Sequence, residues 1–451
     1  MQKKICYSII VTIVILSGCK SQESSAKLPQ RRPLGGDYET FFPSNSLDEQ
    51  AEDVQGAAPV TGVLTLKKAL AAALLGNPRL QNVAWSIRIA EARHLQASLR
   101  PNPELDLGME NIAGSGAFSG TGNAETTVAV GQIIETGAKR DKRIEVAELD
   151  SQLAGWDFEA QRLAILTEVT EAFVDALAAQ EGLQVIDQEV TLAQKIMQTV
   201  EQRVAAGKDT PLQATQARVN LTRIRMKQKR LQQELATLYR VLATTWGATQ
   251  AEFTQVEGSL NHIAPPPQIA TLESLVTLHP HVARWDTEIK QRQAKLTLEK
   301  ANARPNPRVM GGYRRLGEAD ESALVLGLSL PLPVHNRNQG QIMEAKVALI
   351  QARRQRDAAL VQVQADLDRA YTALHNAYNA ATDLQQVVLP GAQEAFDMAQ
   401  TGYEMGKFNY LTVLDAQRTL FEVRSQYRTT LADFHKAKAQ IEHLIGQSLP
   451  E

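Results

Sequence analysis

The sequence contains little cysteine, few aromatic residues and almost no net charge. Two of its 451 residues are cysteine, 5% are aromatic, and the formal charge at pH 7 is −2. A charge so close to zero offers no basic surface for nucleic acid and indicates no other partner. The low aromatic content, together with runs rich in Ala, Leu, Gln, Glu and Arg, favours extended helices over several compact domains.

Residue groupings that support catalysis are also missing from the sequence. We find no Ser/His/Asp arrangement, no glycine-rich phosphate loop before a helix, and no carboxylate pair that its spacing singles out. We therefore expect the protein to be no enzyme and to need no cofactor.

The N-terminus has the features of a secretion signal. Two lysines precede an apolar run over residues 5–16, which is shorter than the about 20 residues of a membrane-spanning helix. Leu-Ser-Gly-Cys at 16–19 resembles the bacterial lipobox, which implies cleavage before Cys19 and lipid on its thiol. Lys20 then implies sorting to the outer membrane. An ordinary signal peptide is the alternative; in either case Cys6 is removed, so the mature chain can form no intrachain disulfide.

From about residue 65 the chain repeats itself. Several landmarks recur in the same order, and partners lie about 199 to 204 residues apart. They are Asn77-Pro78 with His279-Pro280, Arg100-Pro101-Asn102-Pro103 with Arg304-Pro305-Asn306-Pro307, Ala206-Gly207-Lys208 with Met405-Gly406-Lys407, and Trp246-Gly247 with Ile445-Gly446. Several independent matches in register indicate an internal duplication.

Each repeat predicts a helix followed by a β-hairpin. The first helix covers about 78–99, and prolines end it. Apolar and polar residues then alternate over 104–110 and 126–134, on either side of a loop rich in Gly and Ser. The second repeat has the same pattern over 308–314 and 324–330. These segments predict two hairpins, or four strands.

A very long helix is expected after each hairpin. No proline occurs between Pro103 and Pro211, and Gly155 and Gly182 are the only glycines within 138–206. About 69 residues of helix would extend roughly 100 Å. Apolar residues spaced by three and four along its distal half, and along the return helix to Trp246, predict an antiparallel coiled coil. In the second repeat Pro390-Gly391 predicts a kink, with a break into two helices as the alternative.

The return helix is only about half as long as the outgoing one. We expect it to stack end to end on the later helix 280–303, so that both lie along one full-length helix. The connecting segments would then form a belt near the middle of a long helical wall.

Four strands are too few to close a barrel. An open sheet edge in lipid leaves backbone groups without partners, at a cost of several kcal/mol each, and single-chain membrane barrels start at about eight strands. If these strands lie in a membrane, other copies of the chain must supply the remaining strands of the barrel. Three copies would supply twelve strands, although the number three does not follow from this argument.

The duplicated unit, the Arg-Pro-Asn-Pro tetrapeptides and the motif at 402–417 resemble the TolC-like outer-membrane efflux proteins. The motif reads Gly-Tyr-Glu-Met-Gly-Lys-Phe-Asn-Tyr-Leu-Thr-Val-Leu-Asp-Ala-Gln. The resemblance covers about 64–447. It implies a mainly α fold with long coiled-coil helices and four membrane strands, completed in a homotrimer as a twelve-stranded barrel and an α-helical periplasmic tunnel. It also implies docking to a periplasmic membrane-fusion adaptor and an inner-membrane resistance-nodulation-division pump.

A narrower likeness concerns the cargo. Residues 110–120, 124–127 and 135–140 are similar to the CzcC-type branch, which exports cobalt, zinc and cadmium or copper. The resemblance therefore implies passive conduction of divalent heavy-metal cations through the outer membrane. A drug or protein-export channel of the same family, or a structural coiled-coil lipoprotein bridging the envelope layers, are the alternatives. The paired hairpins argue against a bridge, which has no use for membrane-length strands.

The turns that close the two coiled coils are the candidate functional site. The family resemblance implies that they form the periplasmic entrance and contact the adaptor. The residues concerned are Gly207, Lys208, Asp209, Gly406, Lys407, Phe408 and Asn409. Asp209 and Glu404 are candidates for a charged constriction. Positive backbone φ explains the glycines equally well, and Lys208 and Lys407 are equally consistent with a solvated surface.

The histidines do not predict a metal site. His279-Pro280-His281 is the most suggestive motif, but the repeat places Asn77 opposite His279, which predicts a helix cap. The other histidines considered, His335, His375, His435 and His443, are scattered along the sequence, whereas borderline metals require clustered ligands.

These observations divide the chain into six segments. They are a signal peptide (1–18), a lipidated tether (19–63), the first repeat (64–248), an inter-repeat belt (249–279), the second repeat (280–447) and a C-terminal tail (448–451).

Overall fold

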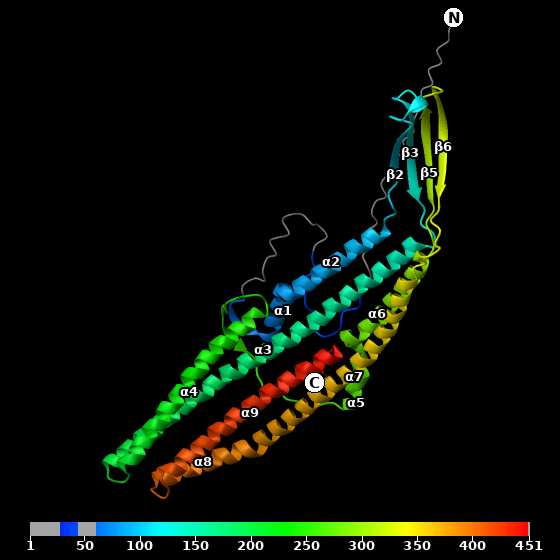
Figure 1. Cartoon of the computed structure of the whole chain (residues 1–451). Helices are drawn as coiled ribbons and strands as arrows, with labels where there is room; N and C mark the ends of the chain where they lie inside the picture. The colour runs from blue at the N-terminus through cyan, green and yellow to red at the C-terminus, as the bar shows by residue number, and fades with distance from the viewer. Residues whose placement is uncertain (1–27, 44–59, 450–451) are drawn as a thin grey trace.

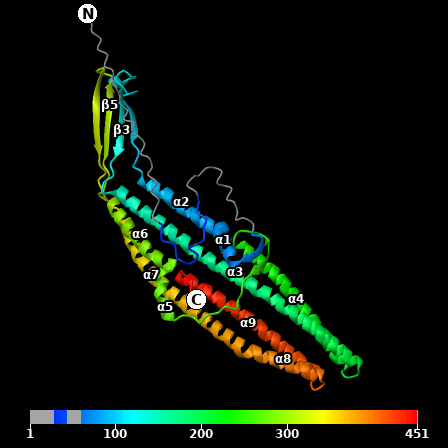
Figure 2. The same cartoon turned by 180° about the vertical axis from the view of Figure 1, so that it is seen from behind.

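The computed structural model describes residues 28–43 and 60–449, and the chain is long and narrow (Figure 1). The expected signal peptide and Cys19 lie outside these residues. A four-stranded sheet forms one end, and two helical hairpins form the other (Figures 1 and 2). The elements are β1 (Gly62–Thr65), α1 (Leu66–Gly76), α2 (Pro78–Ser98), β2 (Glu104–Glu110), η2 (Gly116–Phe118), β3 (Glu125–Ile133), α3 (Lys139–Ala205), α4 (Pro211–Thr244), β4 (Phe253–Glu257), α5 (Ile269–Leu275), η3 (Val276–Leu278), α6 (Pro280–Asn302), β5 (Arg308–Leu316), β6 (Glu321–Ser329), α7 (Gln339–Asp383), η4 (Leu384–Val388), α8 (Leu389–Glu404) and α9 (Tyr410–Ile445).

The sheet confirms both predicted hairpins. Its order is β2-β3-β5-β6, and all neighbouring strands are antiparallel, so β3 and β5 join the two repeats. Leu105 lies opposite Val130, and Leu107 lies opposite Val128. Because side chains alternate between the faces of a strand, this register gathers the apolar residues on one face. β2 and β6 are the outer strands of this sheet.

The first coiled coil also follows the prediction. α3 contains 67 residues, which at 1.5 Å per residue is about 100 Å. Its distal half buries Ile186, Ala193 and Val200 at intervals of seven, and α4 buries Leu221 and Ile224 against this part of the molecule. The seven-residue spacing keeps one seam of α3 facing its partner.

The outgoing helix of the second repeat continues through Pro390. α7 passes into the π-helical turn η4, and α8 follows directly from Leu389 with helical backbone at the junction. Proline has no N–H to donate, and its ring clashes with the carbonyl four residues earlier, which is Gln386 in η4. The wider turn accommodates the proline without ending the helix, so the alternative of a break into two helices does not occur.

The order in which helices stack differs from the prediction. α4 ends beside the start of α2, where Asn77 Nδ2 donates to the Thr245 carbonyl at 2.7 Å. α9 ends beside the start of α6, where the rings of His279 and His443 lie 5.2 Å apart. Each return helix therefore stacks on the first helix of its own repeat, and the predicted stacking of α4 on α6 is wrong. Helix length alone could not show whether α4 stacks on α2 or on α6, since α2 has 21 residues and α6 has 23.

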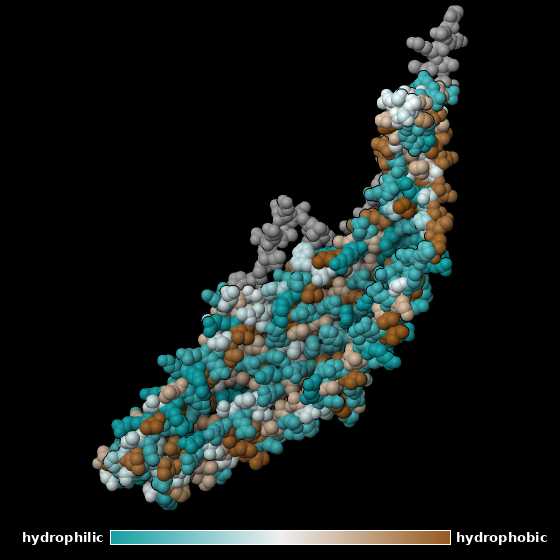
Figure 3. All heavy atoms as spheres, in the orientation of Figure 1, coloured by the Kyte–Doolittle hydropathy of each residue, from teal (hydrophilic) through white to brown (hydrophobic). Residues whose placement is uncertain are grey.

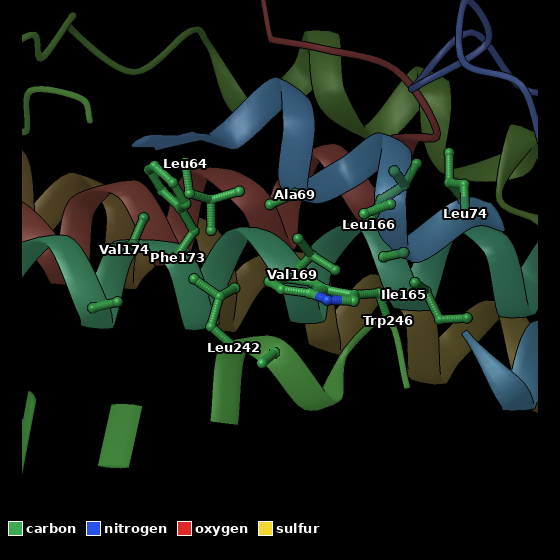
Figure 4. Packing of buried hydrophobic residues seen from close by; sticks show 14 of the residues in the cluster. Leu64, Ala69, Leu74, Ile165, Leu166, Val169, Phe173, Val174, Leu242 and Trp246 are labelled. Atoms are coloured by element: carbon green, nitrogen blue, oxygen red, sulfur yellow. The ribbon is translucent and has the colours of Figure 1, made fainter. Parts of the chain in front are cut away.

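A buried core surrounds the first of these joints (Figure 4). Its labelled residues come from β1 and α1 (Leu64, Ala69, Leu74), from α3 (Ile165, Leu166, Val169, Phe173, Val174), and from the end of α4 and the turn after it (Leu242, Trp246). β1 and β4 pair in parallel beside it. Each large apolar side chain buried here contributes about 1.5–3 kcal/mol, which fixes the joint at mid-length of α3.

Residues 28–43 lie against the helical body, which the sequence did not predict. Arg162 is fully buried on α3 and donates to the carbonyls of Leu34 at 2.8 Å and Arg32 at 3.0 Å. Glu159 pairs with Arg162 at 2.7 Å and accepts from the Arg32 backbone N–H at 2.6 Å. We call residues 28–43 the strap.

The strap joins distant parts of both repeats. Its Leu34 N–H donates to the Gly446 carbonyl at the end of α9 (3.0 Å), and Phe41 N–H donates to the Leu74 carbonyl in α1 (3.0 Å). Gly155 makes the crossing possible, because a Cβ there would lie 2.5 Å from Cδ of Pro29. The first of the two glycines in the long helix is thus explained by packing.

Candidate functional site

The two hairpins end in turns of the same geometry. Gly207 has φ +69° and Gly406 has φ +75°, values that glycine adopts without strain. The next residue in each turn closes it by a backbone bond. Lys208 N–H donates to the Arg203 carbonyl (2.9 Å), and Lys407 N–H donates to the Gly402 carbonyl (2.8 Å). Each helix end thereby satisfies a carbonyl that would otherwise lack a partner.

One carboxylate joins the two turns. Asp209 accepts from Arg203 Nε at 2.8 Å and from the Tyr403 hydroxyl at 2.5 Å. The Arg203 guanidinium lies over the Tyr403 ring, with Cζ 4.6 Å from the centroid, and also donates to the Glu404 carbonyl at 3.4 Å. We call Arg203, Asp209 and Tyr403 the tip cluster.

The tip cluster is largely shielded from water. The side chain of Asp209 is 8% exposed and that of Arg203 is 18% exposed, while Tyr403 is 2% exposed. Burial raises the pKa of Tyr403, and its hydrogen bond to Asp209 raises that pKa further. The phenol therefore remains a donor at physiological pH. A hydrogen bond to a charged group contributes about 1.5–3 kcal/mol, so this contact can hold the turns together and can also be broken.

The other predicted tip residues are more exposed. Lys208 and Lys407 are exposed at matching positions, and Phe408 is 47% exposed while its ring packs on Gly402. Asn409 caps α9 by accepting from Thr412 N–H at 3.1 Å. These residues leave two lysines and an aromatic ring available at the tip.

Glu404 is not part of the tip cluster through its carboxylate. That side chain accepts from Gln400 on its own helix at 3.2 Å, and its role as a constriction residue stays a prediction. Sequence reasoning missed Arg203 and Tyr403, although Tyr403 lies within the 402–417 motif and Arg203 in the last turn of α3. The sequence shows that the two turns match, but it does not show which side chains of one turn contact the other.

Polar contacts continue between the hairpins along α3 and α9. Lys436 pairs with Asp175 at 2.9 Å, and Gln440 donates to Glu171 at 3.1 Å. Further along, Arg428 packs on Gly182, where a Cβ would lie 2.9 Å from its Nη1. A groove of about 500 Å³ opens here between α3, α4 and α9. Along this stretch the hairpins thus meet through polar side chains, whereas nearer the tip Ile196 and Val200 of α3 share a buried apolar cluster with α8 and α9.

The sheet carries charge on one face. Arg308 Nη2 on β5 reaches across β3 to β2, where it lies 2.5 Å from Asp106 and 3.0 Å from Glu104. Arg314 Nη1 lies 3.1 Å from Glu125 and 3.6 Å from Glu110. By the strand register this face also includes Glu321, so five carboxylates accompany two arginines. The face therefore has three net negative charges per chain.

The opposite face of the sheet is apolar and exposed. On β6 the exposed fractions of Leu324, Leu326 and Leu328 are 85%, 88% and 73%. Leu105 and Leu107 on β2 are also more than half exposed. Figure 3 shows hydrophobic side chains gathered along this end of the molecule. Such a contiguous apolar surface indicates contact with lipid or protein.

Neither a helical membrane span nor a metal site is evident in residues 28–43 and 60–449. Within these ranges no helix combines the length and apolarity required to cross a bilayer. No group of three or more His, Cys, Asp or Glu side chains in them is placed to hold a metal ion. The expectation that His443 stands apart is wrong, however, because the stacking of α9 on α6 brings it beside His279.

Comparison with known proteins identifies the family. The model of the outer membrane efflux protein family matches residues 69–248 and 273–447. The chain belongs to this family. It is 33% identical to the cobalt-zinc-cadmium resistance protein CzcC of Cupriavidus metallidurans, over 90% of this chain and 97% of CzcC. It is 28% identical to the nickel-cobalt-cadmium resistance protein NccC of Alcaligenes xylosoxydans xylosoxydans, over 66% of each chain.

A solved structure supports the same assignment at the level of fold. The chain matches a crystal structure of CusC with a TM-score of 0.70 and 16% identity, over 94% of this chain and 98% of the other. The predicted TolC-like fold is therefore confirmed: long helical hairpins with a small sheet at one end.

Proposed function

We propose that this outer membrane efflux protein conducts divalent heavy-metal cations from a periplasmic adaptor and an inner-membrane resistance-nodulation-division pump to the outside. The observation that carries this proposal is the 33% identity with CzcC over 97% of that protein's length. Conduction is passive, since the pump supplies the energy. The chain acts as a wall of a tube and has no need to bind its cargo tightly.

The conducting unit is a homotrimer. One chain supplies four strands, whose outer members β2 and β6 need partners in lipid. Three copies give twelve strands, enough to close a barrel with the apolar face toward lipid and the charged face toward the lumen. Three net negative charges per chain on the charged face favour cations in the exit.

The tip is the end that meets the adaptor. Lys208, Lys407 and Phe408 are exposed there and offer charged and aromatic contacts. The tip cluster holds the two hairpins of one chain together in a closed resting state. Release of Tyr403 from Asp209 allows the hairpins to separate and the entrance to widen.

Lipid on Cys19 anchors the chain to the outer membrane. The strap, which follows this anchor in the sequence, lies against the middle of the helical body, where Arg162 holds it. We propose the same division of the chain as the sequence predicts, namely a signal peptide, a tether, two repeats separated by a belt, and a tail.

Conductance of the purified oligomer in a planar lipid bilayer tests the proposal. A conduit gives discrete current steps with preference for cations, whereas a structural lipoprotein gives none. Because a closed entrance passes little current, Asp209→Asn is measured beside the wild type. Absence of current in both proteins, with the oligomer intact, would refute the channel.

A further inference from the structure

The joint between α9 and α6 contains three histidines that conduction does not use. His279 is 3% exposed, and its ring centroid lies 5.2 Å from those of His281 and His443. Both ring nitrogens of His279 and Nδ1 of His443 are buried without a hydrogen-bond partner among the described residues. A cavity of about 740 Å³ borders the three rings. Buried polar atoms are rarely left in this state, and each case requires an explanation.

In the first repeat, asparagine occupies the position that corresponds to His279. Asn77 accepts from the backbone N–H groups of Arg79 at 2.9 Å and Leu80 at 3.2 Å, and donates to Thr245 at 2.7 Å. Its backbone angles (φ −66°, ψ 119°) are close to those of His279 (φ −58°, ψ 133°). His279 makes no side-chain cap bond. The position therefore suits a capping residue, and the histidine makes this joint less stable than an asparagine would.

The carboxylates near the three rings are already paired with arginines. The charged groups around the three rings are Arg284 on α6, Asp157 on α3, Asp366 and Arg369 on α7, and Arg32 of the strap. Arg369 pairs with Asp366, and Arg284 pairs with Asp157 at 3.3 Å. Arg32 lies over the Trp156 ring. Both carboxylates are thus engaged by arginine, and one further cation is present.

We propose that the joint of α9 and α6 is a proton-sensitive hinge, in which protonation of the His279–His281–His443 group loosens α9 from α6. A proton on any of these rings places a positive charge beside two other imidazoles and near the Arg32 guanidinium, while the nearby carboxylates are paired with Arg284 and Arg369, and the joint relieves that repulsion by opening to water. The Asn77 joint has no titrating group at this position and does not respond.

The direction of the pH effect follows from the burial of these rings. Burial lowers the pKa of His279 to about 3, and it lowers the pKa values of His281 and His443 as well. In an open or unfolded chain histidine titrates near its usual value of about 6.5. Below that pH the open joint binds protons that the closed joint excludes. The closed joint therefore loses stability as pH falls from about 6.5 toward the lowered pKa values of the buried histidines.

The hinge lies at the base of a moving part. α9 runs from this joint to the turn at 405–409, beside which Tyr403 binds Asp209 (Figure 1). Opening at the base allows the α8–α9 hairpin to change its angle to α6. A low periplasmic pH thereby loosens the second hairpin of each chain and leaves the first hairpin unchanged.

Hydrogen exchange on the intact oligomer tests this hinge. Exchange is measured at pH 7.5 and pH 5.0 and corrected for the intrinsic rate at each pH. Amides at 441–445 and 282–286 should lose protection by about tenfold at pH 5.0, the equivalent of one pKa unit. Amides at 241–245 and 80–84, across the Asn77 joint, should keep theirs. An equal change at both joints, or no change at either, overturns the proposal.

Exchanging the two joint residues provides the matched control. His279→Asn should keep the fold, because the same backbone geometry accepts Asn77, and should abolish the loss of protection at pH 5.0. Asn77→His should transfer that loss to the first joint. If His279→Asn does not assemble, His443→Gln is measured in its place. A variant that lacks the histidine but keeps the full acid response contradicts the hinge.

Discussion

Tyr403 donates its hydroxyl to Asp209 at 2.5 Å, although 194 residues separate them in the chain. The contact joins the turn of the second hairpin to the turn of the first. Arg203 completes it from the end of α3. Three side chains thus link the two hairpins of one chain at the tip, beside the apolar cluster that Ile196 and Val200 share with α8 and α9.

Tyr403→Phe removes the hydroxyl and leaves the ring. Loss of a hydrogen bond to a charged group destabilises the closed tip by about 1.5–3 kcal/mol, or roughly 10- to 150-fold in the ratio of closed to open states. Single-channel recording should therefore show longer or more frequent openings than in the wild type.

Tyr410→Phe is the matched control for this variant. Tyr410 is equally buried, and its ring centroid lies 6.4 Å from that of Tyr403, but within the described part of the chain its hydroxyl makes no hydrogen bond to Asp209. It should leave the recordings unchanged. Equal behaviour of the two variants would show that the hydroxyl of Tyr403 does not hold the tip.

Arg162→Met should destabilise the protein strongly. The change leaves Glu159 buried without its cation and removes both hydrogen bonds to the strap carbonyls. Breaking a buried ion pair costs about 3–5 kcal/mol. Thermal unfolding of the purified oligomer, followed by circular dichroism, should show a clearly lower transition temperature.

The pair of Arg79 and Glu168 provides a control on the same long helix. Both side chains are about half exposed, at 57% and 47%. Arg79→Met should therefore cost less than about 1 kcal/mol. If Arg79→Met and Arg162→Met lower the transition by similar amounts, the strap is not held as described.

Leu326→Arg should prevent assembly in the membrane. Leu326 is 88% exposed on the apolar face of β6, and an arginine facing lipid near the bilayer centre costs about 2–4 kcal/mol. Val325→Arg places the same charge on the opposite face and should be tolerated. The fraction of chain recovered as oligomer from outer membranes measures both variants, and a reversed order would contradict the orientation of the sheet.

The sequence predicted most elements of the fold because their signals are local. The absence of proline between Pro103 and Pro211 predicted the long helix, and alternation over 104–110 and 126–134 predicted a hairpin. Both features depend on residues a few positions apart. The turn glycines were located in the same way.

The remaining features depend on contacts between distant residues. Helix length did not reveal that α4 stacks on α2, because α6 is nearly as long. Residues 28–43 show no periodicity, so their binding site on Arg162 became evident only in the structure. The tip cluster was missed because it forms only when the two repeats pack together, and the three histidines were missed because they meet only when α9 stacks on α6.

The cargo is the central claim, and metal tolerance of the producing bacterium tests it most directly. The gene for this chain is deleted, then restored as wild type or as Leu326→Arg, and growth is measured across concentrations of cobalt, zinc, cadmium, copper and several antibiotics. The account predicts that deletion lowers tolerance to the divalent metals, that the wild type restores it and Leu326→Arg does not, and that antibiotic tolerance stays the same. Unchanged metal tolerance with increased antibiotic sensitivity would contradict it.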